Sequence, residues 1–274
     1  MSEQFGESRL MFADILAYKQ PVTFTGAGEL QTLDLQLNDA GPFEILQICD
    51  TLTSEFYLNI IEPRRGNYWF NDRLPATCIS GTGQEPFELP VSKIVSDSQL
   101  LRLDLKNGIT ANNTGEIIII GAQLSNQATG APREIAMRPI GGYYRADYPG
   151  EFAAYGVEVN FTANNEVQKL TIPIMNDYNF DTFYFLDNHS SAKPWSFNVD
   201  DASRGTSIFA TKIPASCVAG TGSKPFILPV TKPYIAGGSI IVNAQNGPFS
   251  GVNSGWLVLA GANRWSNEGM TNAG

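Results

Sequence analysis

The sequence carries one motif twice, as LPATCISGTGQEPFELPVSK at residues 74–93 and as IPASCVAGTGSKPFILPVTK at residues 213–232. The two copies are 139 residues apart, and twelve of the twenty aligned positions are identical. A repeat of this length indicates the architecture of the chain before single elements are considered, because each copy belongs to one structural unit. We therefore predict an internal duplication.

The similarity continues on both sides of the motif. Downstream, Asn107-Gly108 matches Asn246-Gly247, and upstream VTFTGAGELQTLDLQL (22–37) matches VNFTANNEVQKLTIPI (159–174) at a spacing of 137 residues. These matches predict five segments: an N-terminal arm (1–16), a first domain (17–123), a connector (124–153), a second domain (154–263) and a polar tail (264–274).

Both units have the hydrophobic pattern of β-strands. Leu33, Leu35 and Leu37 alternate with polar residues, which is typical of a strand with one buried face. The runs from Ile117 to Ile120 and from Trp256 to Leu259 are continuously apolar, which predicts strands covered on both faces. The fold class is therefore all-β, with two tandem antiparallel β-sandwich or jelly-roll-like domains and a short N-terminal arm or helix.

The motif itself predicts a fixed loop. Glycine and proline interrupt the segment from Gly81 to Pro90, so we expect a loop in which Phe87 and Leu89 fill the sandwich. Cys78 and Cys217 stand at equivalent positions just before this loop, and we expect both to be buried as small hydrophobic residues.

The composition restricts the classes of partner. The chain has 274 residues with 18 Lys and Arg against 27 Asp and Glu, a net charge of −9, and its one basic cluster is the pair Arg64-Arg65. Nucleic acid is excluded, since phosphates require clusters of cations. No apolar run is long enough to cross a membrane, and the start lacks the pattern of a signal peptide. We expect synthesis in the cytoplasm and no membrane partner.

Catalytic and metal-binding signatures are also missing. The single histidine, His189, is expected in an exposed loop, and the three cysteines have no CxxC spacing. GTGSKP (220–225) resembles a phosphate-binding loop, but its twin GTGQEP (81–86) lacks the lysine, so a turn is the better interpretation. The sequence therefore predicts no enzyme activity, no cofactor and no metal ion.

Loops that differ between the units are the candidates for binding. The first unit has EPRRGNYWFNDR (62–73), and the second has a segment (186–212) that looks longer. Phe56 is aligned with Phe183, and with this alignment the first unit is expected to carry about ten extra residues before Phe56. The candidate interaction residues in these loops are Arg64, Arg65, Tyr68, Trp69, Trp195, Asp200 and Asp201. For the two tryptophans, a shared anchor in the core is the alternative. For the aspartates, the alternative is a calcium site, although their spacing fits no EF-hand.

The order of features in each unit is the basis of a family resemblance. An apolar strand pair precedes a Trp/Phe segment, then Gly-Thr-Gly, Pro-Phe-x-Leu-Pro and an alternating strand that ends at Asn-Gly. This order resembles that of tandem β-sandwich structural proteins in the virions of tailed bacteriophages. The resemblance covers both units and carries over no functional residue.

The resemblance implies a non-enzymatic component of a virion: a capsid-associated, decoration, minor capsid or neck/collar protein. Such a protein would act by self-association as a homo-oligomer and by docking to other virion proteins. The alternative is a carbohydrate-binding or adhesion module, with Tyr68, Trp69, Tyr184 and Trp195 as stacking platforms for a glycan. A glycan hydrolase that uses Asp200 and Asp201 is the weakest hypothesis, since no carboxylate pair can be recognised from spacing alone.

Overall fold

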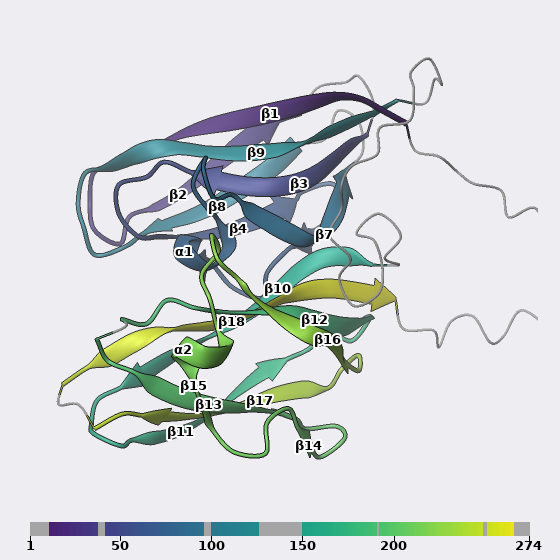
Figure 1. The fold of residues 1–274 in the computed structure, drawn as a ribbon. Coiled ribbons are helices and arrows are strands. Elements are labelled where there is room, and N and C mark those ends of the chain that lie inside the picture. Colours follow the sequence, from purple (N-terminus) through teal and green to yellow (C-terminus); the bar gives the residue numbers. More distant parts are fainter. Residues whose placement is uncertain are drawn as a thin grey trace, which may run out of the picture.

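The computed structural model describes residues 11–37, 42–95, 100–125, 150–190, 192–248 and 251–265. Figure 1 shows two β-sandwiches, with the first half of the chain above the second. All strand pairs are antiparallel. The predicted all-β class with two tandem sandwiches is confirmed.

The described residues of the first half form nine strands and one helical turn. One sheet has the order β1-β9-β3-β7 and the other β2-β8-β4-β5, with β6 also paired to β4. The elements are β1 (Met11–Phe24), β2 (Leu30–Gln36), β3 (Phe43–Asp50), β4 (Phe56–Glu62), β5 (Asn67–Tyr68), β6 (Leu74–Pro75), α1 (Ala76–Ile79), β7 (Phe87–Val95), β8 (Leu100–Asn107) and β9 (Asn113–Ser125).

The second half repeats this arrangement strand for strand. Its sheets have the orders β10-β18-β12-β16 and β11-β17-β13-β14, with β15 also paired to β13. The elements are β10 (Glu151–Phe161), β11 (Val167–Pro173), β12 (Tyr178–Asp187), β13 (Trp195–Asp201), β14 (Thr206–Ser207), β15 (Ile213–Pro214), α2 (Ala215–Val218), β16 (Phe226–Tyr234), β17 (Ser239–Asn246) and β18 (Asn253–Trp265).

Three of the predicted segments lie largely outside the described residues. β1 begins at Met11, so the last six residues of the segment 1–16 are strand and not helix. Residues 1–10 of the arm, 126–149 of the connector and 266–274 of the tail are outside the part of the chain that the structure describes. No helix among the described residues is long and apolar enough to cross a membrane.

The strand register corrects the alignment of the two halves. Phe56 pairs with Asn107 on β8, and Trp195 pairs with Asn246 on β17, so Phe56 and Trp195 are equivalent at a spacing of 139. The spacing on β3 and β12 is 137, so the second half has two more residues in the loop before β13 (139 − 137 = 2). The expected ten extra residues in the first half were wrong. A period of two hides such slips, because alternation looks the same after any even shift.

The segment after the Gly-Thr-Gly turn is a strand and not the predicted loop. Phe87 to Val95 forms β7, although Pro90 lies within it. Strand β7 is the edge of its sheet, and its pairing with β3 breaks between Glu88 and Lys93, so the missing N–H of Pro90 leaves no ladder bond unmade. The turn before it is fixed by Gly81, where a Cβ would lie 2.2 Å from the Glu85 carbonyl oxygen.

The two halves share apolar packing. The core of the first half includes side chains from the second half, among them Phe152, Ala154, Tyr184 and Val258. The outer face of the sheet β10-β18-β12-β16 is covered by the first half, and its inner face is covered by its own sandwich. The predicted double coverage of Trp256–Leu259 is thereby confirmed. The corresponding run from Ile117 to Ile120 differs, because Ile118 and Ile120 stay partly exposed.

Candidate functional site

The interface between the halves uses one face of the first half, formed by β7, α1 and residues 69–71. The ring of Phe87 lies 6.0 Å from that of Phe152 and 6.4 Å from that of Tyr184, centroid to centroid. Val91, further along β7, is 2% exposed. Strand β7 thus packs against β10 and β18 of the second half.

Polar contacts fix the register of this interface. Asn71 donates from Nδ2 to the Gly156 carbonyl oxygen at 2.9 Å, and its Oδ1 accepts from the Gly156 N–H at 2.7 Å. Beside this pair, Phe70 and Ala154 form a parallel β-bridge. A Cβ at Gly156 would lie 2.4 Å from a methyl group of Leu74, so a larger residue here would force the Leu74 side chain to shift. The side-chain amide of Asn71 therefore makes the pair of hydrogen bonds to β10 that the backbone of a neighbouring strand would make.

A buried ion cluster lies at the same interface. The ammonium of Lys93 lies 3.0 Å from Glu62 Oε1 and also contacts the carboxylate of Glu151 in the second half. The indole of Trp69 donates to Glu62 Oε1 at 3.0 Å, and Arg65 lies 3.3 Å from Glu151. Buried charges are tolerated when they are paired and hydrogen-bonded, as they are here.

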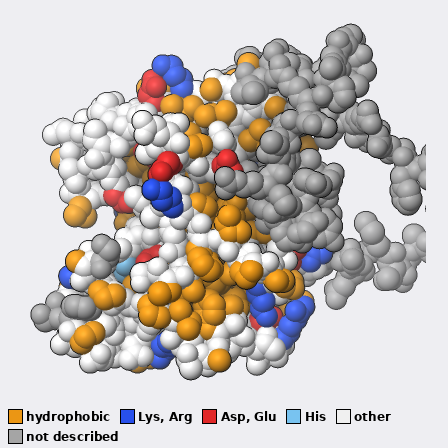
Figure 2. Space-filling model, in the orientation of Figure 1, with side chains coloured by type: hydrophobic (Ala, Val, Ile, Leu, Met, Phe, Trp, Pro, Cys, Tyr) orange, Lys and Arg blue, Asp and Glu red, His pale blue; other side chains and the backbone are white. Residues whose placement is uncertain are grey.

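The equivalent face of the second half is exposed. We call it the α2 face and define it by α2, residues 208–210 and β16. Val230 is 74% exposed, Ile227 is 46% exposed, and Phe209 and Phe226 are partly exposed. Figure 2 shows hydrophobic side chains gathered over the part of the second half that contains α2 and β16. An apolar group of this kind indicates an interaction surface.

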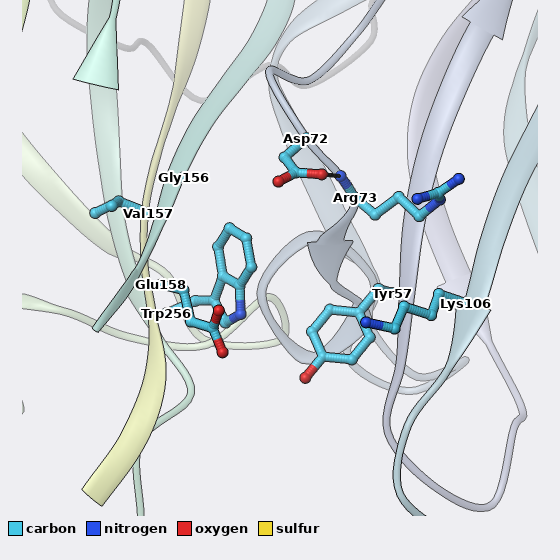
Figure 3. Close-up of a pocket in the computed structure, with 8 residues that line it drawn as sticks. All are labelled: Tyr57, Asp72, Arg73, Lys106, Gly156, Val157, Glu158 and Trp256. Carbon is cyan, nitrogen blue, oxygen red and sulfur yellow. Dashed lines mark hydrogen bonds between the residues drawn. The ribbon is translucent and has the colours of Figure 1, made fainter. Parts of the chain in front are cut away.

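A second feature is a cleft of about 390 Å³ between the halves (Figure 3). Tyr57, Arg73 and Lys106 form the wall from the first half, and Glu158 and Trp256 form the wall from the second. The rings of Tyr57 and Trp256 are 6.3 Å apart, and the Lys106 ammonium lies 5.7 Å from the Tyr57 ring centroid. Arg73 is held by Asp104 at 2.9 Å. The cleft therefore presents aromatic and charged groups together.

The structure corrects several candidate loop residues. Arg64, Arg65 and Tyr68 are exposed, but Trp69 and Trp195 are buried in the core, as is Tyr184. These buried rings cannot serve as stacking platforms. The strand register also makes Ile208, and not Trp195, the equivalent of Trp69, because each donates its N–H to the same position on the preceding strand.

The two candidate aspartates have structural roles. Asp201 is buried and accepts from the Ser203 N–H at 3.0 Å, so it closes the turn between β13 and β14. Asp200 points elsewhere and accepts from Ser207 and Asn243, each at 2.6 Å. Among the described residues no group of three or more His, Cys, Asp and Glu side chains could hold a metal ion.

Two further sequence predictions were wrong. The His189 side chain is buried, with Nδ1 2.6 Å from Asp187 Oδ1 and Nε2 3.2 Å from the Val159 carbonyl oxygen, because it packs against the Trp195 ring. Cys78 is buried as expected, but Cys217 is exposed, because the second half covers α1 whereas nothing in the described chain covers α2 in the same way.

Sequence reasoning missed the α2 face for a clear reason. Val91 and Val230 are identical in the aligned motif, as are Phe87 and Phe226, so a comparison of the two copies gives no reason to expect one member of each pair to be exposed. The exposure of the α2 face follows from how the two halves are stacked. It is a property of the tertiary structure and leaves no signal in the motif.

Comparisons with known proteins identify no family. No family model matches the chain, and no curated protein matches it. The STIV major capsid protein is similar in structure with a TM-score of 0.42 and 11% identity, over 95% of this chain and 100% of that chain. The PBSX exported protein XepA gives a TM-score of 0.28 and 10% identity, over 89% of this chain and 86% of that chain.

PNGase F, a glycosylasparaginase from Flavobacterium meningosepticum, gives a TM-score of 0.35 and 8% identity, over 93% of this chain and 98% of that chain. The three similarities are loose, and none assigns a function to the chain.

Proposed function

We propose that the protein is a non-enzymatic structural component of a bacteriophage virion, in a capsid-associated, decoration, minor capsid or neck/collar position. It acts by self-association into a homo-oligomer and by docking to other virion proteins. The proposal includes an origin by internal duplication, with domains at 17–123 and 154–263, which the repeated motif and the repeated strand order support.

The observation that carries the proposal is the exposed α2 face. Val230 alone leaves most of a valine side chain in water, whereas the equivalent Val91 of the first half is buried. Covering apolar surface contributes about 25 cal/mol per Å², so a face with several such residues favours association. The order of features in the sequence, which resembles that of phage structural proteins, gives the type of assembly.

The experiment is detection of the protein in particles. Virions are purified from the phage that encodes the chain and analysed by quantitative mass spectrometry, with a non-structural protein of the same phage as the negative control. The proposal predicts a fixed copy number per particle that survives repeated density-gradient purification. Absence from purified particles would contradict it.

The cleft favours one second candidate, a carbohydrate-binding function. Stacking on Tyr57, together with hydrogen bonds donated by Arg73 and accepted by Glu158, is the kind of contact that sugars require. The test is titration of tryptophan fluorescence with a glycan panel, with Trp256 beside Tyr57 as the reporter and Tyr57→Leu as the matched variant. Binding that is lost in this variant supports the candidate, and an unchanged spectrum in the wild-type chain contradicts it.

A further inference from the structure

A second copy of the same chain is the partner that fits the α2 face, an inference that rests on the proposed self-association. We propose that the first half of one copy docks on the α2 face of the next copy, in the same relation that the second half has to the first within one chain. Strand β10 covers β7 inside the chain, and its equivalent β1 is the free edge of the first sheet, far from the second half in Figure 1.

The surface around β1 carries apolar side chains beside the Lys19–Glu116 ion pair, and no described residue covers it. Within the chain, Ala154, Val258 and Ala260 are buried under the first half. Their equivalents on β1 and β9 are Ala17, which is exposed, and Ile118 and Ile120, which are partly exposed. The continuous apolar run from Ile117 to Ile120 is the pattern of a strand with two covered faces, and a docked copy supplies the missing cover.

Gly83 in the first half is free of steric contacts within the described part of one chain, unlike its equivalent Gly222. Gly222 lies against α1, where its N–H donates to the Thr77 carbonyl oxygen at 2.7 Å and a Cβ would lie 2.2 Å from the Ser80 oxygen. The equivalent Gly83 has no atom within 4 Å of a Cβ, and its φ is outside the left-handed region. In the proposed contact, Gly83 of one copy meets α2 of the next, which requires the same close approach.

Charges at equivalent positions favour contact between unlike halves. Glu85 pairs with Lys224 at 3.1 Å within the chain, and these two residues are equivalent in the motif. Head-to-tail docking again places Lys224 beside Glu85, whereas contact between two like halves would bring two equal charges together.

The resulting interface is heterologous, because the two contacting surfaces are different. Such contacts generate closed rings when the rotation between copies closes, and filaments when it does not. A two-fold dimer, in which one patch meets itself, does not arise from this geometry.

The test is site-directed cross-linking in a Cys217→Ser background, which leaves Cys49 and Cys78 buried. Lys19 and Ala210 are the equivalents of Gly156 and Asn71, and both are exposed. Two full-length chains of different tag length, one with Lys19→Cys and one with Ala210→Cys, are mixed and treated with a short bismaleimide. The proposal predicts mixed covalent dimers in the mixture and none in either chain alone. Dimers in a single-variant sample, or none in the mixture, would overturn it.

A second variant pair separates docking from folding. Gly83→Val is expected to weaken association about tenfold with an unchanged melting temperature, whereas Gly222→Val is expected to lower the melting temperature. Sedimentation of the wild-type chain distinguishes the two proposals. An oligomer without mixed cross-links contradicts the head-to-tail contact and leaves self-association standing, and a monomer at all concentrations contradicts both.

Discussion

Val91 and Val230 occupy the same position in the two halves, yet Val91 is 2% exposed and Val230 is 74% exposed. The difference has one cause: the second half covers β7, and no described part of the chain covers β16. The comparison of Val91 with Val230 therefore shows how much stacking of the halves reduces the exposure of the same side chain at equivalent positions. It also identifies the surface on which the proposed function depends.

Truncation at these two positions should have unequal effects. Val91→Ala removes two buried methyl groups and leaves a cavity, which we expect to lower the free energy of unfolding by about 2 kcal/mol. Val230→Ala should change it by less than about 0.5 kcal/mol. Urea unfolding at concentrations where the chain is monomeric measures both. Equal effects would contradict the buried interface between the halves.

Removal of the buried ammonium at the interface should be strongly destabilising. Lys93→Met leaves the buried Glu62 carboxylate without its nearest cation, and breaking a buried pair in this way costs about 3–5 kcal/mol. The control is Lys232→Met at the equivalent, partly exposed position. Thermal unfolding of monomeric protein compares the two. A loss in the Lys93 variant no larger than in the control would show that the ion cluster does not stabilise the interface.

Two equivalent glutamates should give the protein an acid-sensitive contribution to stability. The hydrogen bond from Gln31, followed by those of nearby backbone N–H groups, lowers the pKa of Glu29 from 4.5 to about 2, and Gln168 does the same for Glu166. Because the folded-state pKa is lowered, this stabilisation is present above pH 4.5 and is lost as the pH falls towards 2.

We expect the double variant Glu29→Gln/Glu166→Gln to melt roughly 2 °C below the wild-type chain at pH 7, and the difference to vanish near pH 2. Calorimetry over this pH range is the measurement, with Glu158→Gln at an exposed position as the control. A difference that stays constant with pH would contradict the assignment.

The three cysteines should react at very different rates. Burial raises the pKa of the Cys78 and Cys49 thiols, which keeps them protonated and unreactive, whereas Cys217 lies exposed on the α2 face. At concentrations where the chain is monomeric, a thiol reagent at pH 8 should label one cysteine per native chain within minutes and all three only after unfolding. Peptide mapping identifies the labelled site, and label on Cys78 in the native chain would contradict the covered position of α1.

Much of the fold follows from local pattern. The alternation at Leu33, Leu35 and Leu37 predicted a strand with one buried face, and the repeated motif predicted two similar sandwiches. The pattern did not predict β7, since Pro90 is compatible with a strand only at the edge of a sheet. Edge position depends on strand order, which no local window contains.

The candidate site was less predictable than the fold. Trp69 and Trp195 were conspicuous because of their residue type, but large aromatic side chains are most often buried, as these are. Val230 was inconspicuous because its twin is a core residue. The α2 face differs from the equivalent buried face only in what is stacked upon it. Stacking is set by contacts distant in sequence, such as that between Asn71 and Gly156, which are 85 positions apart.

Sedimentation velocity of the wild-type chain and of Val230→Glu tests self-association through the α2 face most directly. Because Val230 is exposed in the single chain, the glutamate is tolerated in the monomer, as circular dichroism will verify, but it is costly to bury in a contact. We predict that the wild-type chain sediments as an oligomer at micromolar concentration and that the variant sediments as a monomer. An oligomer of unchanged size in the variant, or a wild-type monomer at every concentration, would contradict the account.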